Sequence, residues 1–190
     1  MDSYNMSEEE EGLLKVKQII GGIVLPIVIK TAIELNLFET MAKTPGGRFS
    51  CFDLASSLPR QSHETPVLIE RIHRFLAGHS ILTSTVVKDE HGDSKNMYGM
   101  TTVSNYYVRK QDGTSHASSL LLAYDKVLVD CWFHLKDALI EGGVPFDKAH
   151  EMNLFEYPAK DNRFNNVFNK GMYDFTTIVM KIILEKYKGI

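Results

Sequence analysis

The side chains that could act as acids, bases or metal ligands are scattered along this chain. His63, His73 and His79 come closest to a cluster, but spacings of ten and six residues do not stack them on one helix face. The two cysteines, Cys51 and Cys131, lie far apart and show no spacing typical of a zinc site or a disulfide framework. The sequence therefore predicts no metal site and favours a reducing compartment.

Carboxylates are the next candidates for acid and base chemistry. Asp125, Asp130 and Asp137 lie near one another in sequence, but Asp130 and Asp137 share a helix face with Lys and His neighbours, which indicates a solvated face more simply than an active site. The glycine pairs at 21–22, 46–47 and 142–143 are isolated, and no glycine-rich phosphate-binding motif is present. A nucleotide site is not predicted within these residues.

An apolar stripe near the C-terminus is the remaining candidate. Aromatic and methionine side chains recur there at helical spacing, as Phe164, Phe168, Met172, Phe175, Val179 and Ile182. Such a stripe is usually helix core. It could also be a wall against which a flat aromatic ligand packs. Periodicity alone does not separate the two interpretations.

Composition limits the class of protein. The chain has 190 residues, 44% of them hydrophobic, and a net charge of −3, which fits a globular protein and disfavours a polyanionic partner such as nucleic acid. The acidic N-terminus is unlike a signal peptide. The apolar run 18–29 is too short to span a bilayer and contains Pro26, so we expect it to be buried by protein, either within the chain or by a partner subunit.

The elements that position these residues are expected to be mostly helices. Residues 1–11 are expected to be disordered, a helix begins at Leu13 and breaks at Gly21-Gly22, and another runs from Pro26 to about Phe38. Further along, we expect a short helix capped by Ser50, a helix over 64–80, a hairpin of strands 81–87 and 96–102, one long helix over 119–143 and a last helix over 161–188.

Two short helices followed by a hairpin form a winged-helix pattern. Such a fold can present its second helix to the major groove of DNA. Here that helix offers Arg71, His73 and Arg74 beside Glu64 and Glu70, so its charge nearly cancels. A scaffold role is therefore favoured over DNA binding.

Three segments carry a resemblance to a known family. They are "LPIVIKTAIELNLFE", "DKVLVDCWFHLKDALIEGGVPFDKAHEMNLFEY" and "DNRFNNVFNKGMYDFTTIVMKIILEKYKGI". In order and spacing, from about residue 13 to the end, the chain resembles plant S-adenosylmethionine-dependent O-methyltransferases of the caffeic-acid and alkaloid type. The segment "HEMNLFEYPAKDNRF" is most similar to the benzylisoquinoline-alkaloid branch.

The resemblance implies a mainly α fold. A winged-helix-containing helical dimerisation region with a small β-hairpin is expected over 12–117, after the disordered residues 1–11. Long helices over 118–190 would form a substrate wall and lead toward a Rossmann-like methyltransferase domain. That domain is expected to be absent, because the chain stops before the position of its first strand.

The resemblance also implies a set of site residues. If the resemblance holds at this position, Ile23 would reach into the substrate pocket of a partner subunit. The substrate wall would consist of Leu122, Ala123, Leu128, Leu154, Pro158, Phe164, Phe168 and Met172. Pro158 stands where the phenylpropanoid branch has a histidine, and Leu122-Ala123 where it has a Met-Asn pair. Loss of these polar groups favours a larger, less polar polycycle over a caffeate-like substrate.

The same resemblance implies the partners and the division of labour. We expect a cytoplasmic homodimer that acts on a phenolic benzylisoquinoline or related aromatic substrate, without nucleic acid, membrane or metal. S-adenosylmethionine and the catalytic base would be held by the missing domain, so none of the seven histidines is assigned as catalytic and the fragment alone is expected to be inactive. Two alternatives stay open: a natural truncated dimer partner without activity, and a winged-helix regulator that binds DNA.

Overall fold

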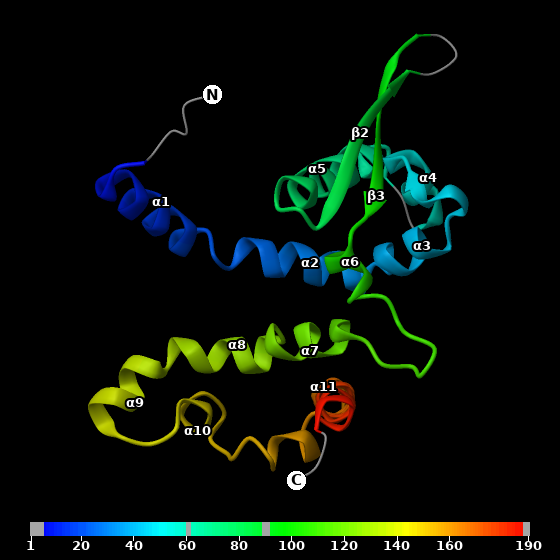
Figure 1. Cartoon of the computed structure of the whole chain (residues 1–190). Coiled ribbons are helices and arrows are strands. Elements are labelled where there is room, and N and C mark those ends of the chain that lie inside the picture. The colour runs from blue at the N-terminus through cyan, green and yellow to red at the C-terminus, as the bar shows by residue number, and fades with distance from the viewer. Residues whose placement is uncertain (1–5, 60–61, 89–91, 188–190) are drawn as a thin grey trace.

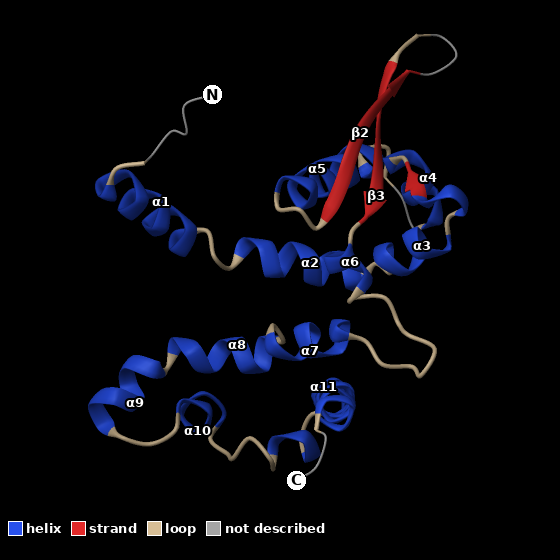
Figure 2. Cartoon of the chain, viewed as in Figure 1, coloured by secondary structure: helices blue, strands red, loops and turns tan. Residues whose placement is uncertain are grey.

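The computed structural model describes residues 6–59, 62–88 and 92–187, and it confirms a mainly helical fold with one small sheet (Figures 1 and 2). The N-terminal part contains α1 (Glu8–Ile20), α2 (Val24–Glu34), α3 (Leu37–Lys43), the 3-10 turn η1 (Pro45–Gly47), β1 (Arg48–Phe49), α4 (Cys51–Ser57), α5 (Thr65–Gly78), β2 (Leu82–Lys88), β3 (Ser94–Met100) and α6 (Thr102–Asn105). The C-terminal part contains α7 (His116–Ala123), α8 (Lys126–Phe133), α9 (Leu135–Glu141), α10 (Pro145–His150), the 3-10 turn η2 (Tyr157–Ala159) and α11 (Asn162–Lys186).

The predicted hairpin is present and is extended by a third strand. β2 and β3 pair antiparallel, and β1 pairs with the other edge of β3, so the order is β1-β3-β2. Gly99 faces Thr83 across the ladder, where an added Cβ would lie 2.7 Å from the Thr83 hydroxyl oxygen. A strand as short as β1 carries no periodicity, which is why the sequence did not predict it. The succession α4, α5, β2, β3 is the one from which the winged-helix interpretation was drawn.

The first hydrophobic core lies between this sheet and helices α2 to α5. Ser50 caps α4 as predicted, because its hydroxyl accepts the backbone N–H of Asp53 while the Asp53 carboxylate accepts the backbone N–H of Ser50 at 2.9 Å. The buried members of this core are Ile29, Ala32, Leu37, Phe38, Met41, Phe49, Cys51, Leu54, Ala55, Ile69, Leu76, Ile81, Leu82 and Tyr98.

The N-terminal helices differ from the sequence-based description. Part of the expected disordered segment, residues 1–5, lies outside the described residues, whereas Glu8–Glu11 form the first turn of α1. Ser7 and Glu10 close a capping box there. Acidic side chains stabilise the positive end of a helix.

The apolar run 18–29 belongs to a longer helical stretch than the sequence suggested. Glu8–Glu34 spans 27 residues, and by length and composition alone it could cross a membrane; only 6% of its most apolar window is buried. The stretch that could cross a membrane by length is therefore longer than the run 18–29, which alone is too short. The exposed apolar side chains on α1 and α2 include Leu13, Leu14, Val16, Ile19, Ile20, Ile23, Val24 and Ile27.

The single long helix expected over 119–143 is wrong, since α7, α8 and α9 are separate helices. Tyr124 leaves helical geometry, with φ −109° and ψ 21°, and Asp125 then caps α8 by accepting the backbone N–H of Val127 at 3.0 Å. Trp132 on α8 and Leu139 on α9 are both exposed. The predicted stop at Gly142, with φ +78°, is confirmed.

The last helix, α11, is confirmed over 25 residues, but its buried face differs from the predicted stripe. Phe164 is buried and Phe168 is half-buried, whereas Met172 and Phe175 are exposed. The buried positions beyond Phe168 are instead Gly171, Asp174 and Ile178. This face is covered by α7, which runs across α11 (Figure 1). Hydrogen bonds to Asp174 allow a polar residue at the centre of that contact.

Candidate functional site

An ion pair holds the corner between α7 and α8 against the start of α11. Both terminal nitrogens of Arg163 contact the carboxylate of Asp125, with Nη2–Oδ1 at 3.0 Å. Asp125 is buried, whereas Asp130 and Asp137 are exposed. Burial raises the pKa of the Asp125 carboxyl group, but the Arg163 and Val127 hydrogen bonds outweigh burial, and the pKa lies below its usual range.

An aromatic cluster follows directly from this corner. The rings of Tyr157 and Phe164 lie 5.5 Å apart and nearly perpendicular, and the Phe164 and Phe168 centroids are 5.8 Å apart. Phe155 meets the far edge of Phe168 at 6.4 Å. Phe164 is fully buried, so the rings on η2 and on the first two turns of α11 pack against one another by edge and face contacts. Phe146 stacks edge-on against Tyr157 from α10.

The second hydrophobic core gathers most of the predicted wall residues. Its buried members are Val127, Cys131, Phe146 and Phe164, and the half-buried side chains packed against them are Leu122, Leu128, Ala149, Leu154, Tyr157 and Phe168. Pro158 is half-buried in η2, whereas Ala123 and Met172 are exposed and are not part of this core. The structure thus brings Leu122, Leu128, Leu154, Phe164 and Phe168 together.

Ile23 lies near another wall residue of the same chain. A cavity of about 510 Å³ is lined by Ile23 from the α1–α2 turn and by Ala123, Tyr124, Val129, Trp132 and Phe133. Its lining is mainly apolar and includes two exposed aromatic rings. This cavity joins the N-terminal helices to the wall helices α7 and α8.

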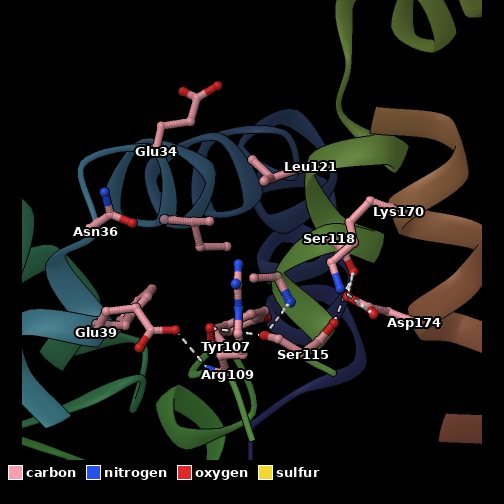
Figure 3. A pocket seen from close by; sticks show the side chains of 13 residues that line it. Glu34, Asn36, Glu39, Tyr107, Arg109, Ser115, Ser118, Leu121, Lys170 and Asp174 are labelled. Carbon is pink, nitrogen blue, oxygen red and sulfur yellow. Dashed lines mark hydrogen bonds and ion pairs between the residues drawn. The ribbon is translucent and has the colours of Figure 1, made fainter. Parts of the chain in front are cut away.

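A second cavity, of about 300 Å³, separates the two parts of the chain (Figure 3). Glu34, Glu39 and Arg109 line one side, and Ser118, Lys170 and Asp174 lie together on the other side. The backbone N–H of Arg109 donates to Glu39 at 2.7 Å. None of the predicted wall residues lines this cavity, which is mixed in charge.

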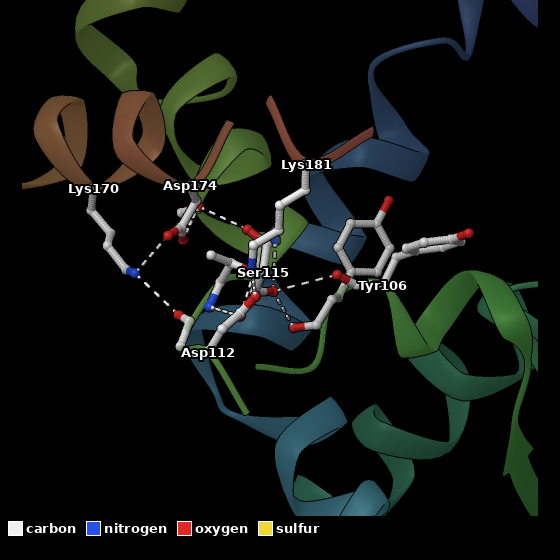
Figure 4. Close-up of polar contacts among 11 residues, drawn as sticks. Tyr106, Asp112, Ser115, Lys170, Asp174 and Lys181 are labelled. Carbon is white, nitrogen blue, oxygen red and sulfur yellow. Dashed lines mark hydrogen bonds and ion pairs between the residues drawn. The ribbon is translucent and has the colours of Figure 1, made fainter. Parts of the chain in front are cut away.

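A buried polar network crosses from α7 to α11 (Figure 4). Asp174 is fully buried, and its carboxylate accepts the Ser118 hydroxyl at 2.6 Å and the Lys170 ammonium at 2.7 Å. Lys170 also reaches the carbonyl of Gly113 at 3.2 Å. Sequence reasoning did not select Ser118, Gly171 or Asp174. The one available signal was the i, i+4 spacing of Lys170 and Asp174 on the last helix.

A third polar group lies at the edge of the first core. Glu70 accepts hydrogen bonds from Cys51, Asn96, Tyr98 and Arg74. Burial opposes its ionisation, but these donors outweigh burial and lower its pKa to about 2. One of the positive charges that α5 could offer to DNA, that of Arg74, is therefore paired with Glu70.

A metal site is not found among the residues that the structure describes. No group of three or more His, Cys, Asp or Glu side chains in 6–59, 62–88 and 92–187 could hold a metal ion. The histidines also take other places: His73 is buried in the first core, and His150 packs on Tyr157 with Nε2 2.8 Å from the carbonyl of Val127.

Comparison with known proteins gives the family. Residues 17–110 match the O-methyltransferase dimerisation domain, and residues 132–190 match the O-methyltransferase domain. The chain is 47% identical over 190 residues to caffeic acid 3-O-methyltransferase of Rosa chinensis, covering 100% of this chain and 52% of that protein. It is 45% identical over 185 residues to (iso)eugenol O-methyltransferase of Clarkia breweri, covering 96% of this chain and 50% of that protein.

A solved structure shows the same fold at low identity. Human N-acetylserotonin methyltransferase, crystallised in complex with SAM, superposes with a TM-score of 0.74 at 18% identity, over 99% of this chain and 51% of that chain. The chain spans about half the length of the curated relatives it matches. With both of its parts matched to the same enzymes, the chain belongs to the plant O-methyltransferase family that carries this dimerisation domain.

Proposed function

We propose that this chain is the dimerisation and substrate-wall part of an S-adenosylmethionine-dependent enzyme that methylates a phenolic hydroxyl of a plant alkaloid. The observation that carries the proposal is the assembly of Leu122, Leu128, Leu154, Phe164 and Phe168 on one apolar core within a chain of this family. These residues come from four separate segments. Their convergence is what a wall for an aromatic ring requires.

In the proposed reaction the phenol oxygen forms a bond to the methyl carbon of the donor, the carbon–sulfur bond breaks, and a base takes the phenol proton. We assign the donor site and the base to the part of the relatives' length that this chain does not match. The sequence itself has no glycine-rich turn to hold the donor. This chain would contribute position, because a phenol held in line with the methyl group reacts as in a unimolecular step.

The proposed substrate is a polycyclic phenol. The side chains of Leu122, Ala123 and Pro158 have no polar group. The wall would therefore bind a larger aromatic ring system mainly by apolar contacts. The resemblance of the 150–164 region to the benzylisoquinoline branch, and to scoulerine 9-O-methyltransferases in particular, supports the same choice. The relatives compared above carry the names of smaller, single-ring phenols, so both classes belong in the assay.

The proposed assembly is a cytoplasmic homodimer that works without a metal. The match to a dimerisation domain over 17–110 supports the dimer, and the exposed apolar side chains of α1 and α2 supply a surface for it. Ile23 lies beside Ala123, so the α1–α2 turn is adjacent to the wall. A partner's copy of this turn would complete the pocket.

Methyl transfer tests the proposal. The chain joined to its methyltransferase domain is incubated with labelled S-adenosylmethionine and a panel of single-ring and polycyclic phenols. Label is expected in the polycyclic product, and this chain alone is expected to transfer none. Transfer to no phenol, or to single-ring phenols alone, would contradict the proposed activity or substrate.

The two other functions have less support. An inactive truncated dimer partner shares every residue with this chain, and the labelled-donor assay on the longest natural protein separates the two. A DNA-binding role is disfavoured because the Glu70 carboxylate pairs with Arg74 on α5 and because that region lies within the dimerisation match. Salt-sensitive retention on heparin would reverse this order.

A further inference from the structure

Helices α7 and α11 approach each other more closely than side chains normally allow. They share more contacts than any other two helices in the described part of the chain. At their crossing stands Gly171, where an added Cβ would lie 2.8 Å from Leu122 Cδ2, 2.9 Å from Leu122 Cβ and 3.2 Å from the carbonyl oxygen of Ser118. A larger residue at this position must displace the Leu122 side chain. It must also push the helices apart, because the carbonyl oxygen of Ser118 belongs to the backbone of α7 and cannot move by itself.

A polar network holds the same crossing at a fixed rotation. Ser118 and Asp174 face each other across the contact, one turn of α11 beyond Gly171, with their oxygens 2.6 Å apart. Lys170 supplies the compensating charge from the preceding turn of α11. A fully buried carboxylate is costly unless its partners stay in place, so rotation or sliding of α11 would leave Asp174 without its hydrogen bonds.

The crossing is directly connected to the wall. Leu122, the residue that contacts Gly171, is a wall residue on α7, and Phe168 lies one turn before Gly171 on α11. The spacing of the two helices therefore sets the separation of Leu122 and Phe168. Among the described residues, this crossing is where α7 and α11 are joined both by a close approach at a glycine, Gly171, and by a buried carboxylate, that of Asp174.

We propose that Gly171, Ser118 and Asp174 are positioning residues that set the width of the substrate wall and so determine which size of phenol is accepted. The proposal rests on the proposed function. None of the three needs to touch the substrate. Their effect would pass through Leu122 and Phe168.

The experiment uses the chain joined to its methyltransferase domain and compares kcat and KM for one polycyclic and one single-ring phenol. For Gly171→Ala we expect the KM of the polycyclic phenol to rise roughly tenfold with little change in kcat. The single-ring phenol should change less, because it cannot contact both helices at once. Ser118→Ala should shift the ratio of the two kcat/KM values in the same direction by less.

Two further variants separate positioning from stability. Asp174→Asn can keep a hydrogen bond to Ser118 and is expected to keep the wild-type ratio, whereas Asp174→Ala is expected to lose it. Lys181→Ala is the matched control: it removes an ion pair between α11 and Asp112, outside the wall, and should lower stability without changing the ratio.

The outcomes are distinct. Active Gly171→Ala and Ser118→Ala proteins with an unchanged substrate ratio would overturn the positioning role while leaving the proposed function intact. A ratio that shifts equally in Lys181→Ala would also overturn it, since the effect would then be general loosening. A wild-type protein that methylates no phenol would overturn the proposed function first.

Discussion

Arg163 donates two hydrogen bonds to the carboxylate of Asp125, which lies 38 residues earlier in the chain. This ion pair joins the first turn of α11 to the N-cap of α8. One carboxylate therefore does two things: it starts α8 by binding the backbone N–H of Val127, and it anchors the helix that carries Phe164. The corner of the wall is held by charge as well as by apolar contact.

Removal of Arg163 should destabilise the chain. Arg163→Ala leaves the buried Asp125 carboxylate without its cation, at an expected cost of about 1–3 kcal/mol in the free energy of unfolding. Urea unfolding of the variant and the wild type measures this difference in the free energy of unfolding. Lys148→Ala is the control, because it breaks a pair with the exposed Glu141 and should cost about 1 kcal/mol or less. Equal losses of stability in the two variants would show that the Arg163–Asp125 pair contributes no more than an exposed ion pair.

The buried imidazole of His73 should make stability depend on pH. Burial, partly opposed by the charge of Glu70, lowers the pKa of His73 from its ordinary 6.5 to about 4. Between these values the unfolded chain binds a proton that the folded chain does not, so stability is lost as pH falls from 6.5 toward 4. The loss should reach about 3 kcal/mol.

His73→Phe tests this assignment. A phenyl ring keeps the contacts with Phe49 and Tyr98, and His73 Nε2 has no hydrogen-bond partner within the described residues. The variant should show a flatter dependence of melting temperature on pH in that window. A slope equal to that of the wild type would assign the pH dependence to other groups. Glu70, with its pKa near 2, adds a further loss below its ordinary 4.5 in both proteins.

The dimer should depend on the α1–α2 turn. Ile20 is 77% exposed, so Ile20→Asp leaves the monomer fold intact and places a charge in the proposed interface. Sedimentation velocity should show the wild type near twice 21.5 kDa and the variant as a monomer. Val86→Asp, an exposed apolar position on β2, is the control and should stay dimeric. A dimeric Ile20→Asp protein would place the interface elsewhere.

Other positions on α2 are unsuitable for this test. Leu25 and Val28 are apolar and lie in the same run, but both pack against the first hydrophobic core of their own chain. A charge at either position would damage the fold as well as any interface.

Both cysteines should resist alkylation in the native protein. Burial, together with the hydrogen bond and charge of Glu70, raises the pKa of the Cys51 thiol, and burial raises that of Cys131. Since the thiolate is the nucleophile, iodoacetamide at about pH 8 should leave both unmodified until urea unfolds the chain. Mass spectrometry measures the extent of alkylation at each cysteine. Rapid labelling of Cys51 in the native protein would contradict this prediction, because it would show that the thiol is accessible and ionised.

Elements with local signals could be predicted from the sequence. Ser50 and Asp53 form a cap that depends on four consecutive residues, and the hairpin strands show their own composition. The break at Tyr124 could not be predicted, because the cap formed by Asp125 is fixed by Arg163, far away in sequence. The wall residues came from the resemblance. The resemblance and the periodicity both included Met172, and the periodicity also included Phe175, but both side chains are exposed.

The buried face of α11 shows the same limit. Asp174 on a helix normally indicates a solvated side, and its burial is acceptable because the Ser118 hydroxyl and the Lys170 ammonium both bind its carboxylate. Glycine at 171 is equally uninformative alone, since its role depends on Leu122 lying opposite.

The two hydrophobic cores also imply an order of events during synthesis. All buried members of the first core lie between Ile29 and Tyr98, so that core can close as soon as the hairpin has left the ribosome. The second core needs Phe164, and the Ser118 contact needs Asp174. The face of α7 that carries Ser118 and Leu122 therefore stays uncovered until α11 has been made, and this interval is when the nascent chain is most exposed to misassociation.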